Sequence, residues 1–289
     1  MPYRVARRST RRRNTRPYRR RRTSYRKNRR NTRYGRKRLG MSRRRILNIC
    51  SKKKRNNIIP HNFTFLGASA GTGPKTMGSD RITFLITRPT ALSYDETGAS
   101  DFCRTSQTVF WRGIRESIDI NVAGGAPWRW RRIVFEAKGD PVDSLISNVE
   151  TSTGYNRAMM ELSGDPPATI RNQLESMLFQ GAGGVDWVSV FNAKVDTNRV
   201  KLHADEFTSL RSGNDRGHYH KFRKWYPLNR NMHYFNDETG KDISASSYAS
   251  STIGGMGDIF IFDIFQCLQS SGDFQLQFSP ESTLYWHER

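Results

Sequence analysis

The distribution of charge along the chain is the feature that most constrains its fold. Residues 1–55 contain 26 Lys and Arg and no Asp or Glu, and the first acidic residue is Asp80. Residues 56–289 therefore carry 49 − 26 = 23 basic and 26 acidic side chains, a sum of −3. Because like charges repel and this segment has little apolar surface to bury, residues 1–55 are predicted to form an arm that is disordered on its own. A compact fold must come from the near-neutral remainder.

The composition of the arm predicts that it binds polyanions. Most of its charges are Arg, whose planar guanidinium matches phosphate oxygens, and interleaved Tyr rings can stack on unpaired bases. The predicted nucleic-acid contacts are Arg7, Arg8, Arg11, Arg12, Arg13, Arg16, Arg19, Arg20, Arg21, Arg22, Arg26, Lys27, Arg29, Arg30, Arg33, Tyr18, Tyr25 and Tyr34. A solubility tail or a simple targeting sequence is the alternative, but neither role requires so many charges.

Basic clusters also close the arm. Two such clusters separated by a spacer are typical of a bipartite nuclear import signal, which an import receptor binds in acidic grooves. The residues predicted for import are Arg36, Lys37, Arg38, Arg43, Arg44, Arg45, Lys52, Lys53, Lys54 and Arg55. The same residues can serve as further nucleic-acid contacts, and the two roles do not exclude each other.

The body of the chain is predicted to be all-β. Residues 56–79 are rich in small and turn-forming residues and are predicted to link the arm to a folded domain at 80–289. Runs rich in β-branched and aromatic residues alternate with turn signals in this domain. The clearest predicted strands are Arg81–Arg88, Thr108–Ile120, Trp128–Ala137, Val185–Phe191, Gly257–Cys267 and Phe274–Phe278. Gly257–Cys267 is apolar on both faces, as expected of a central strand.

One or two short helices are expected in the loops between strands. Ile170, Leu174, Met177 and Leu178 recur at helical spacing, and Asp165-Pro166 is suited to begin this helix. A second, weaker helix is predicted at Tyr155–Leu162.

Several classes of protein are excluded by what the sequence lacks. No apolar run is long enough to cross a bilayer, so we expect neither a transmembrane helix nor a membrane partner. The Arg-rich start lacks the apolar segment of a signal peptide. Three widely spaced cysteines suggest reduced thiols of a cytosolic or nuclear protein. No catalytic motif is present, so the protein is predicted to be no enzyme and to need no cofactor.

Two further segments carry open alternatives. His218 and His220, with Asp215 and His233 nearby, could bind a metal, although isolated strand histidines are usually surface residues, and no metal site is predicted. The segments Trp128–Arg132 and His218–Tyr226 interleave basic and aromatic residues. Each could be a second nucleic-acid contact on the body or an ordinary amphipathic strand.

Several stretches spread along the chain resemble the coat proteins of genomoviruses (gemycircularvirus-like), small viruses with circular single-stranded DNA. They are Arg43–Arg55 (RRRILNICSKKKR), Thr108–Glu116 (TVFWRGIRE), Trp130–Phe135 (WRRIVF), Tyr155–Leu162 (YNRAMMEL) and the strand ending near Cys267. Geminivirus coat proteins are related, but they suggest a metal-binding cluster after the arm, whereas Cys50 stands alone here.

The resemblance implies a single jelly roll of two packed antiparallel sheets. It also implies an icosahedral shell of about 60 copies of the chain, with the arms inside on single-stranded DNA. The protein would then occur in the virion and, during assembly, in the host nucleus, which it reaches through a host nuclear import receptor. The alternative is a cellular nucleic-acid-binding protein, ribosomal or chromatin-like, with a basic tail. A large, near-neutral β-rich body is not explained by that alternative.

Overall fold

The computed structural model describes residues 41–139, 148–152, 154–164, 167–212, 215–269 and 273–288. The chain divides into two units, Met1–Ser42 and Arg43–Arg289. All helices and strands within the described ranges belong to the second unit. The description that follows therefore concerns Arg43–Arg289.

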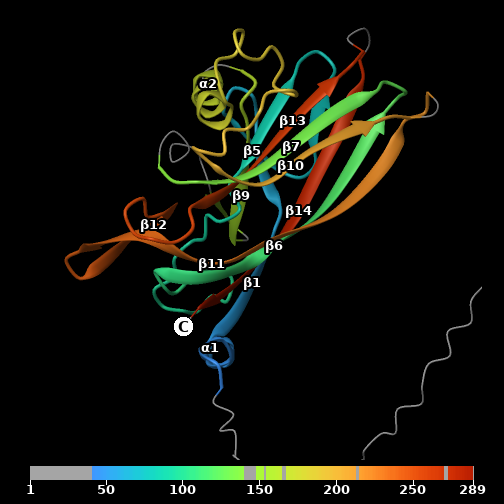
Figure 1. Ribbon diagram of the computed structural model, residues 1–289. Helices are drawn as coiled ribbons and strands as arrows, with labels where there is room; N and C mark the ends of the chain where they lie inside the picture. The colour runs from blue at the N-terminus through green and yellow to red at the C-terminus, as the bar shows by residue number, and fades with distance from the viewer. Residues whose placement is uncertain are drawn as a thin grey trace, which may run out of the picture. The chain divides into compact units, whose positions relative to one another are not determined.

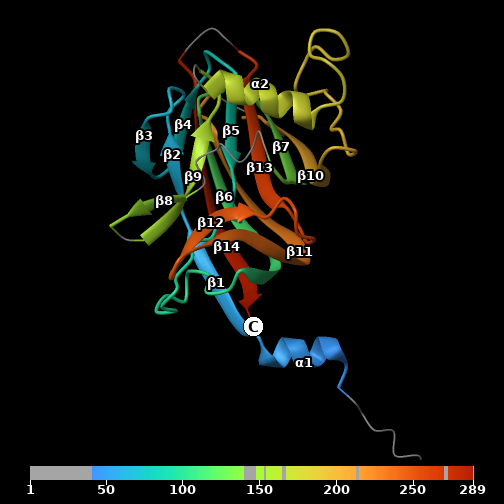
Figure 2. The ribbon, with the colours of Figure 1, turned by 90° about the vertical axis from the view of Figure 1, so that its left-hand side faces the viewer.

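Two β-sheets pack face to face in this unit (Figures 1 and 2). Sheet A has the strand order β1-β14-β6-β11-β12, with β4 beside β14. Its strands are β1 Lys52–Ile58, β4 Lys75–Gly78, β6 Thr108–Ala123, β11 His218–Thr239, β12 Asp242–Ala249 and β14 Gln275–Glu288. Sheet B has the order β10-β7-β13-β5-β9-β2-β3, with β8 beside β9. Its strands are β2 Pro60–Phe63, β3 Ser69–Thr72, β5 Thr83–Thr87, β7 Trp128–Ala137, β8 Asn148–Thr151, β9 Gly154–Glu161, β10 Lys201–Leu210 and β13 Asp258–Cys267.

The connections between the sheets are those of a jelly roll. Strands β5, β7 and β13 lie in sheet B, whereas β6, β11 and β14 lie in sheet A, so the chain crosses between the sheets repeatedly. All pairings between the strands of the described ranges are antiparallel except that of β2 with β9. The predicted all-β fold of two packed sheets is confirmed.

Sheet B is covered on both faces. Its strand β13 lies between β7 and β5, and nearly every residue of β13 is buried, as its two apolar faces predicted. One face of sheet B meets sheet A, and the other is covered by helix α2 (Pro167–Leu178) and the segment 179–200 (Figure 1). The helix predicted from the Ile170–Leu178 spacing is confirmed, with Leu174 and Leu178 fully buried. The Asp165-Pro166 start lies outside the described residues.

Two local predictions are wrong. Tyr155–Leu162 is not a helix: all of it except Leu162 belongs to β9, which pairs with β5, β2 and β8. These pairings bury Met159 and Met160 and outweigh the helical propensity of Ala, Met and Glu. Val185–Phe191 is not a strand, because turns occupy most of it and its Val185 is 84% exposed.

The folded unit begins earlier than the sequence predicted. Arg43–Cys50 forms helix α1, and Lys52–Ile58 pairs along its whole length with the last strand, β14. Residues 43–55 are thus not part of a disordered arm, and the expected linker at 56–79 contains strands β2, β3 and β4. The run of basic residues does not show the alternation typical of a strand, although Lys54, Asn56 and Ile58 of β1 point into the protein.

Candidate nucleic-acid interface

The structure describes only the last part of the predicted binding residues. All predicted contacts from Arg7 to Arg38, including Tyr18, Tyr25 and Tyr34, lie outside the described residues. The others lie on α1 and β1. Exposed members of this group are Arg43, Arg45, Lys52, Lys53 and Arg55.

Lys54 differs from its neighbours because its side chain points into the protein. Its Nζ lies 3.0 Å from Glu288 Oε2, and the two side chains are only 1% and 4% exposed. The same ammonium donates to the Cys103 carbonyl oxygen at 2.8 Å. Lys54 therefore fixes β1 to β14 and is not accessible to a nucleic acid or an import receptor in the folded chain.

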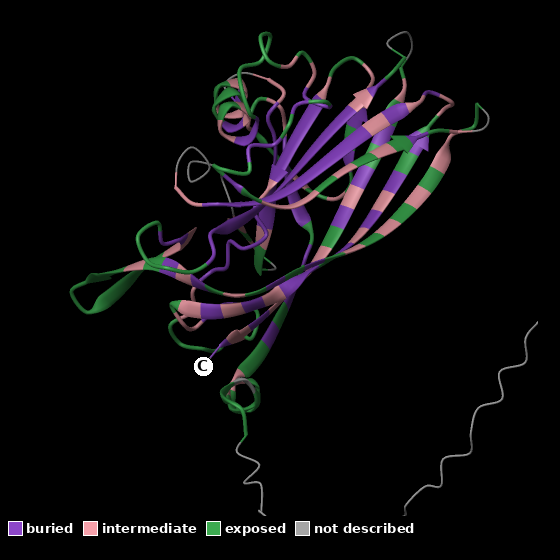
Figure 3. Cartoon of the chain, viewed as in Figure 1, coloured by how far each residue is buried: buried purple, intermediate pink, exposed green. Residues whose placement is uncertain are grey.

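The residues on either side of Lys54 point to the opposite face of sheet A, away from sheet B. Lys53 pairs in register with His287, and Arg55 pairs with Tyr285. Across the next strands, Thr283 aligns with Arg115, and Arg115 aligns with Trp225. This face alternates with the buried one along β6, β11 and β14 (Figure 3).

Basic and aromatic side chains gather on this open face, which we call the basic–aromatic face. Its members are Lys53, Arg55, Phe110, Arg112, Arg115, Tyr219, Lys221, Arg223, Trp225, Tyr285 and His287. They come from four neighbouring strands, and residues as distant in sequence as Arg55 and Trp225 share the face. The end of the basic segment is thus joined to a second basic–aromatic segment by the fold.

Trp225 is the largest exposed ring on this face, and Gly113 makes room for it. The indole lies so close to Gly113 that a Cβ at that position would be 2.6 Å from Trp225 Cζ2. Tyr285 meets the indole edge to face, with centroids 5.8 Å apart and planes at 63°. Trp225 nevertheless stays 50% exposed. The ring is held by two neighbours and remains accessible to a ligand.

The charge on this face is predominantly positive. Six of its members are Lys or Arg. Within the paired parts of the four strands, only two carboxylates, those of Asp119 and Glu281, point to the same side. Asp119 is already bound to Lys221, with Oδ1 and Nζ 3.2 Å apart. The pKa of His287 is lowered by burial and further by Arg112 and Lys53, which favours its neutral form. Phosphate oxygens are the natural counter-charge for such a surface.

The two aromatic–basic segments identified in the sequence differ in exposure. Trp128, Trp130, Arg131 and Arg132 are buried in β7, so Trp128–Arg132 is not an exposed contact and that alternative is wrong. In His218–Tyr226 the odd-numbered residues are exposed, whereas Phe222 packs on Trp130 in the interior.

Only two of the three histidines considered for a metal site lie close together. The rings of His218 and His220 lie 4.7 Å apart between centroids, near one end of β11. His233 lies toward the other end of that strand, where its Nδ1 is 2.7 Å from Thr108 Oγ1. Within the described ranges, no three His, Cys, Asp or Glu side chains form a group able to hold a metal ion.

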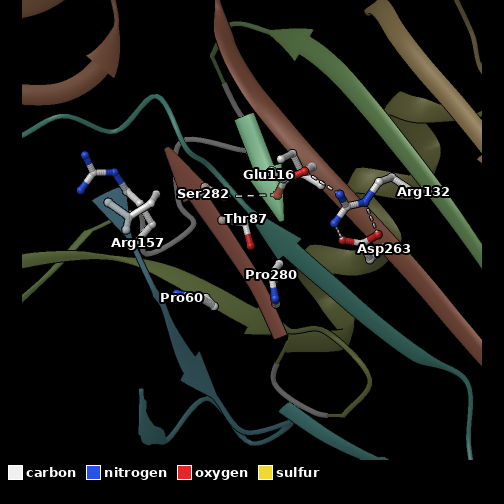
Figure 4. Close-up of a pocket in the computed structure, with 10 residues that line it drawn as sticks. Pro60, Thr87, Glu116, Arg132, Arg157, Asp263, Pro280 and Ser282 are labelled. Carbon is white, nitrogen blue, oxygen red and sulfur yellow. Dashed lines mark hydrogen bonds and ion pairs between the residues drawn. The ribbon is translucent and has the colours of Figure 1, made fainter. Parts of the chain in front are cut away.

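A small cavity between the two sheets has four charged residues among those that line it (Figure 4). Arg132 lies between Glu116 Oε2, at 2.6 Å, and Asp263, whose two oxygens are each 2.7 Å away. Burial alone would lower the pKa of Arg132, but Asp263 and Glu116 raise it well above its ordinary value. The cavity volume of about 10 Å³ holds one water at most. We interpret this cluster as part of the core.

Four members of the basic–aromatic face were not singled out in the sequence: Arg112, Arg115, Tyr285 and His287. Strict strand alternation along Thr108–Ile120 would place Phe110 on the same face as the buried Ile114. The register is irregular between Trp111 and Gly113, and Phe110 therefore lies on the open face. What the sequence could not reveal is the strand order that places β1, β14, β6 and β11 side by side.

No family model and no curated protein matches the chain. Among the described residues, no helix has the length and apolar character needed to span a membrane.

Proposed function

We propose that this protein is a viral coat protein that assembles into an icosahedral shell and packages circular single-stranded DNA. The observation that carries the proposal is the junction between the basic segment and the jelly roll. β1 continues the Arg-rich sequence directly into sheet A, where Lys53 and Arg55 lie beside Tyr285 and His287. A shell-forming fold and a polyanion-binding segment are thereby parts of one chain, as the resemblance to genomovirus coat proteins implies.

The amount of charge supports packaging of a genome. If about 60 chains form the shell, their residues 1–55 supply roughly 60 × 26 ≈ 1,560 positive charges. One cation can neutralise one phosphate, so the total suits a single-stranded genome on the order of two thousand nucleotides. Binding by an Arg-rich segment depends on charge and base stacking, with little readout of sequence.

Exposed apolar residues at the edges of the jelly roll support self-association. Helix α1 exposes Ile46 and Ile49, and the β11–β12 hairpin, which extends from the sandwich in Figure 1, exposes Phe235 and Ile243. Large apolar side chains at projecting elements are suited to contacts between identical copies of a chain. The role is structural and not enzymatic. Its sites would be the virion and, during assembly, the host nucleus, reached through an import receptor.

The proposal is tested by mixing the purified full chain with circular single-stranded DNA. Electron microscopy should show closed particles of uniform size, and the DNA inside should resist nuclease. A chain that begins at Arg43 is the matched control, because it keeps α1 and β1 and lacks 19 of the 26 basic residues. We expect it to protect little DNA. Binding of DNA without closed particles under any condition would contradict the coat-protein role and favour a cellular nucleic-acid-binding protein.

A further inference from the structure

We propose that the basic–aromatic face is a second nucleic-acid site, located on the folded body, and that it selects unpaired over paired strands by stacking a base on Trp225. This inference deepens the proposed function and rests on it. The arm would supply charge, whereas this face would supply the contact that distinguishes single-stranded from duplex DNA.

The first argument is the exposure of the ring. Burying a Trp side chain is strongly favourable, yet Trp225 is half exposed and covers no part of the core. Four of the other five tryptophans differ: Trp111, Trp128, Trp130 and Trp286 are at most 2% exposed. Gly113 on the neighbouring strand provides the space in which the indole lies. Together these features orient a stacking surface toward solvent.

The second argument is the position of the cations around the ring. Arg115 is the direct cross-strand neighbour of Trp225, and Arg223 lies two positions away on the same face of β11. Arg55 is the cross-strand neighbour of Tyr285, which contacts the indole. Within the part of the chain that the structure describes, no carboxylate lies within ion-pair distance of any of these three arginines. Phosphates on either side of a stacked base can therefore find guanidinium partners.

The third argument concerns the form of the nucleic acid. A base can stack on an exposed ring only if its own face is free, which is the case in a single strand and not within a duplex. A duplex would meet the same arginines through its phosphates alone. Ring and charge together thus predict a preference for unpaired strands with little dependence on their sequence.

Tryptophan fluorescence provides a direct readout. Trp225 is the only exposed one of six tryptophans, since Trp187 is partly buried against Phe179 and the other four are buried. We expect a short oligothymidylate to quench the fluorescence of the full chain at high salt, where the arm's counterion-release term is suppressed. A duplex of the same length should quench much less.

The matched variants are Trp225→Ala, Trp225→Phe and Phe207→Ala. Because two of these variants lack the Trp225 indole, binding is compared through the fluorescence anisotropy of a labelled oligothymidylate. At high salt, Trp225→Ala should weaken this binding roughly 5- to 150-fold, as expected for the loss of one stacked base. Trp225→Phe keeps a ring and should lose less. Phe207 is an exposed ring (59%) on β10 of sheet B, away from the basic–aromatic face, so Phe207→Ala should bind like the unchanged chain. The Phe variant keeps the test valid if Trp225→Ala fails to fold.

The outcomes separate this inference from the proposed function. If the full chain binds oligonucleotides at low salt but Trp225→Ala and Phe207→Ala bind equally well at high salt, the stacking site is wrong and the arm alone holds the DNA. If Trp225→Ala weakens duplex and single-strand binding equally, the selection of unpaired strands is wrong. If the full chain binds no polyanion even at low salt, the proposed packaging function itself fails.

Discussion

Lys54 and Glu288 form a buried ion pair that joins the first strand of the sandwich to the last, with Nζ and Oε2 3.0 Å apart. Glu288 Oε2 also accepts hydrogen bonds from the Thr105 backbone N–H, at 3.1 Å, and from its hydroxyl, at 2.6 Å. Its other oxygen, Oε1, accepts the indole N–H of Trp286 at 2.7 Å. The carboxylate is thus fully satisfied where the basic segment enters the fold.

Replacing Lys54 should destabilise the fold, not weaken DNA binding. Lys54→Met leaves Glu288 as a buried charge without its cation, which costs about 3–5 kcal/mol in free energy of unfolding. Lys53→Met is the matched control, since Lys53 is exposed on the next position of the same strand and its loss should cost less than about 0.5 kcal/mol. Denaturant titration of both variants measures this difference. Equal stabilities would show that the pair contributes nothing.

The start of the folded unit predicts how far the chain can be shortened. A chain that begins at Arg43 should fold, because α1 and β1 are retained. A chain that begins at Asn56 loses Lys54 and more than half of β1, and exposes the edge of β14. We expect its unfolding midpoint to be clearly lower and its solubility reduced. Thermal unfolding of the two chains, followed by circular dichroism, compares their midpoints. Identical melting curves would show that the folded domain begins after Arg55, as the sequence predicted.

Two buried arginines at the same cavity should differ in how their replacement by Met changes the free energy of unfolding. Arg132→Met leaves Glu116 and Asp263 as buried carboxylates without a cation. It should lower the free energy of unfolding by about 3–5 kcal/mol. Arg157 is also fully buried, but within the described residues its only side-chain hydrogen bond runs from Nε to the Pro89 carbonyl oxygen at 3.3 Å, and burial lowers its pKa to about 10.

Arg157→Met should therefore be neutral or stabilising, because a poorly compensated buried charge is replaced by an apolar side chain of similar length. Denaturant titration of Arg132→Met and Arg157→Met provides the comparison. If Arg157→Met lowered the free energy of unfolding as much as Arg132→Met, Arg157 would have a structural role that its contacts do not explain.

Glu136 should make stability depend on pH in the acidic range. Burial alone would raise its pKa, but hydrogen bonds from His203 and the Gly257 N–H, together with Arg230 and Lys201, lower it to about 2. Since the folded pKa lies below the unfolded one, the stabilisation is complete above about pH 4.5 and is lost as pH falls toward 2. The stability difference between the unchanged chain and Glu136→Gln should shrink by about 3 kcal/mol over that range.

Exposed Glu96 provides the control for that measurement, and Glu96→Gln should differ from the unchanged chain by less than about 0.5 kcal/mol. Denaturant titrations at a series of pH values test both variants. A constant difference for Glu136→Gln would show that its carboxylate is not stabilised by these partners.

Much of the architecture could be predicted from local patterns. The apolar faces of Gly257–Cys267 predicted the central strand β13, and the spacing of Ile170, Leu174 and Leu178 predicted α2. These predictions succeeded because burial imposes a period on the sequence that does not depend on distant contacts. Tyr155–Leu162 failed because pairing with strands remote in sequence decided its conformation.

The site was predictable only in part, for a related reason. The exposed residues of His218–Tyr226 were recognised as basic and aromatic, but their partners Arg55, Arg115 and Tyr285 are brought to them by strand order. Lys54 was misread for a different reason. In a run of like charges, the one lysine that points inward is identified only by its partner Glu288, which lies near the opposite end of the chain.

The mass of the particle formed by the full chain with circular single-stranded DNA tests the coat-protein account most directly. With about 60 copies of a 33.4 kDa chain, the protein shell alone should weigh about 60 × 33.4 ≈ 2,000 kDa, and the packaged DNA should add to this in a single narrow distribution. Mass photometry or native mass spectrometry can resolve such a species. A chain that remains monomeric or dimeric, or forms DNA complexes of continuously varying mass, would contradict the account.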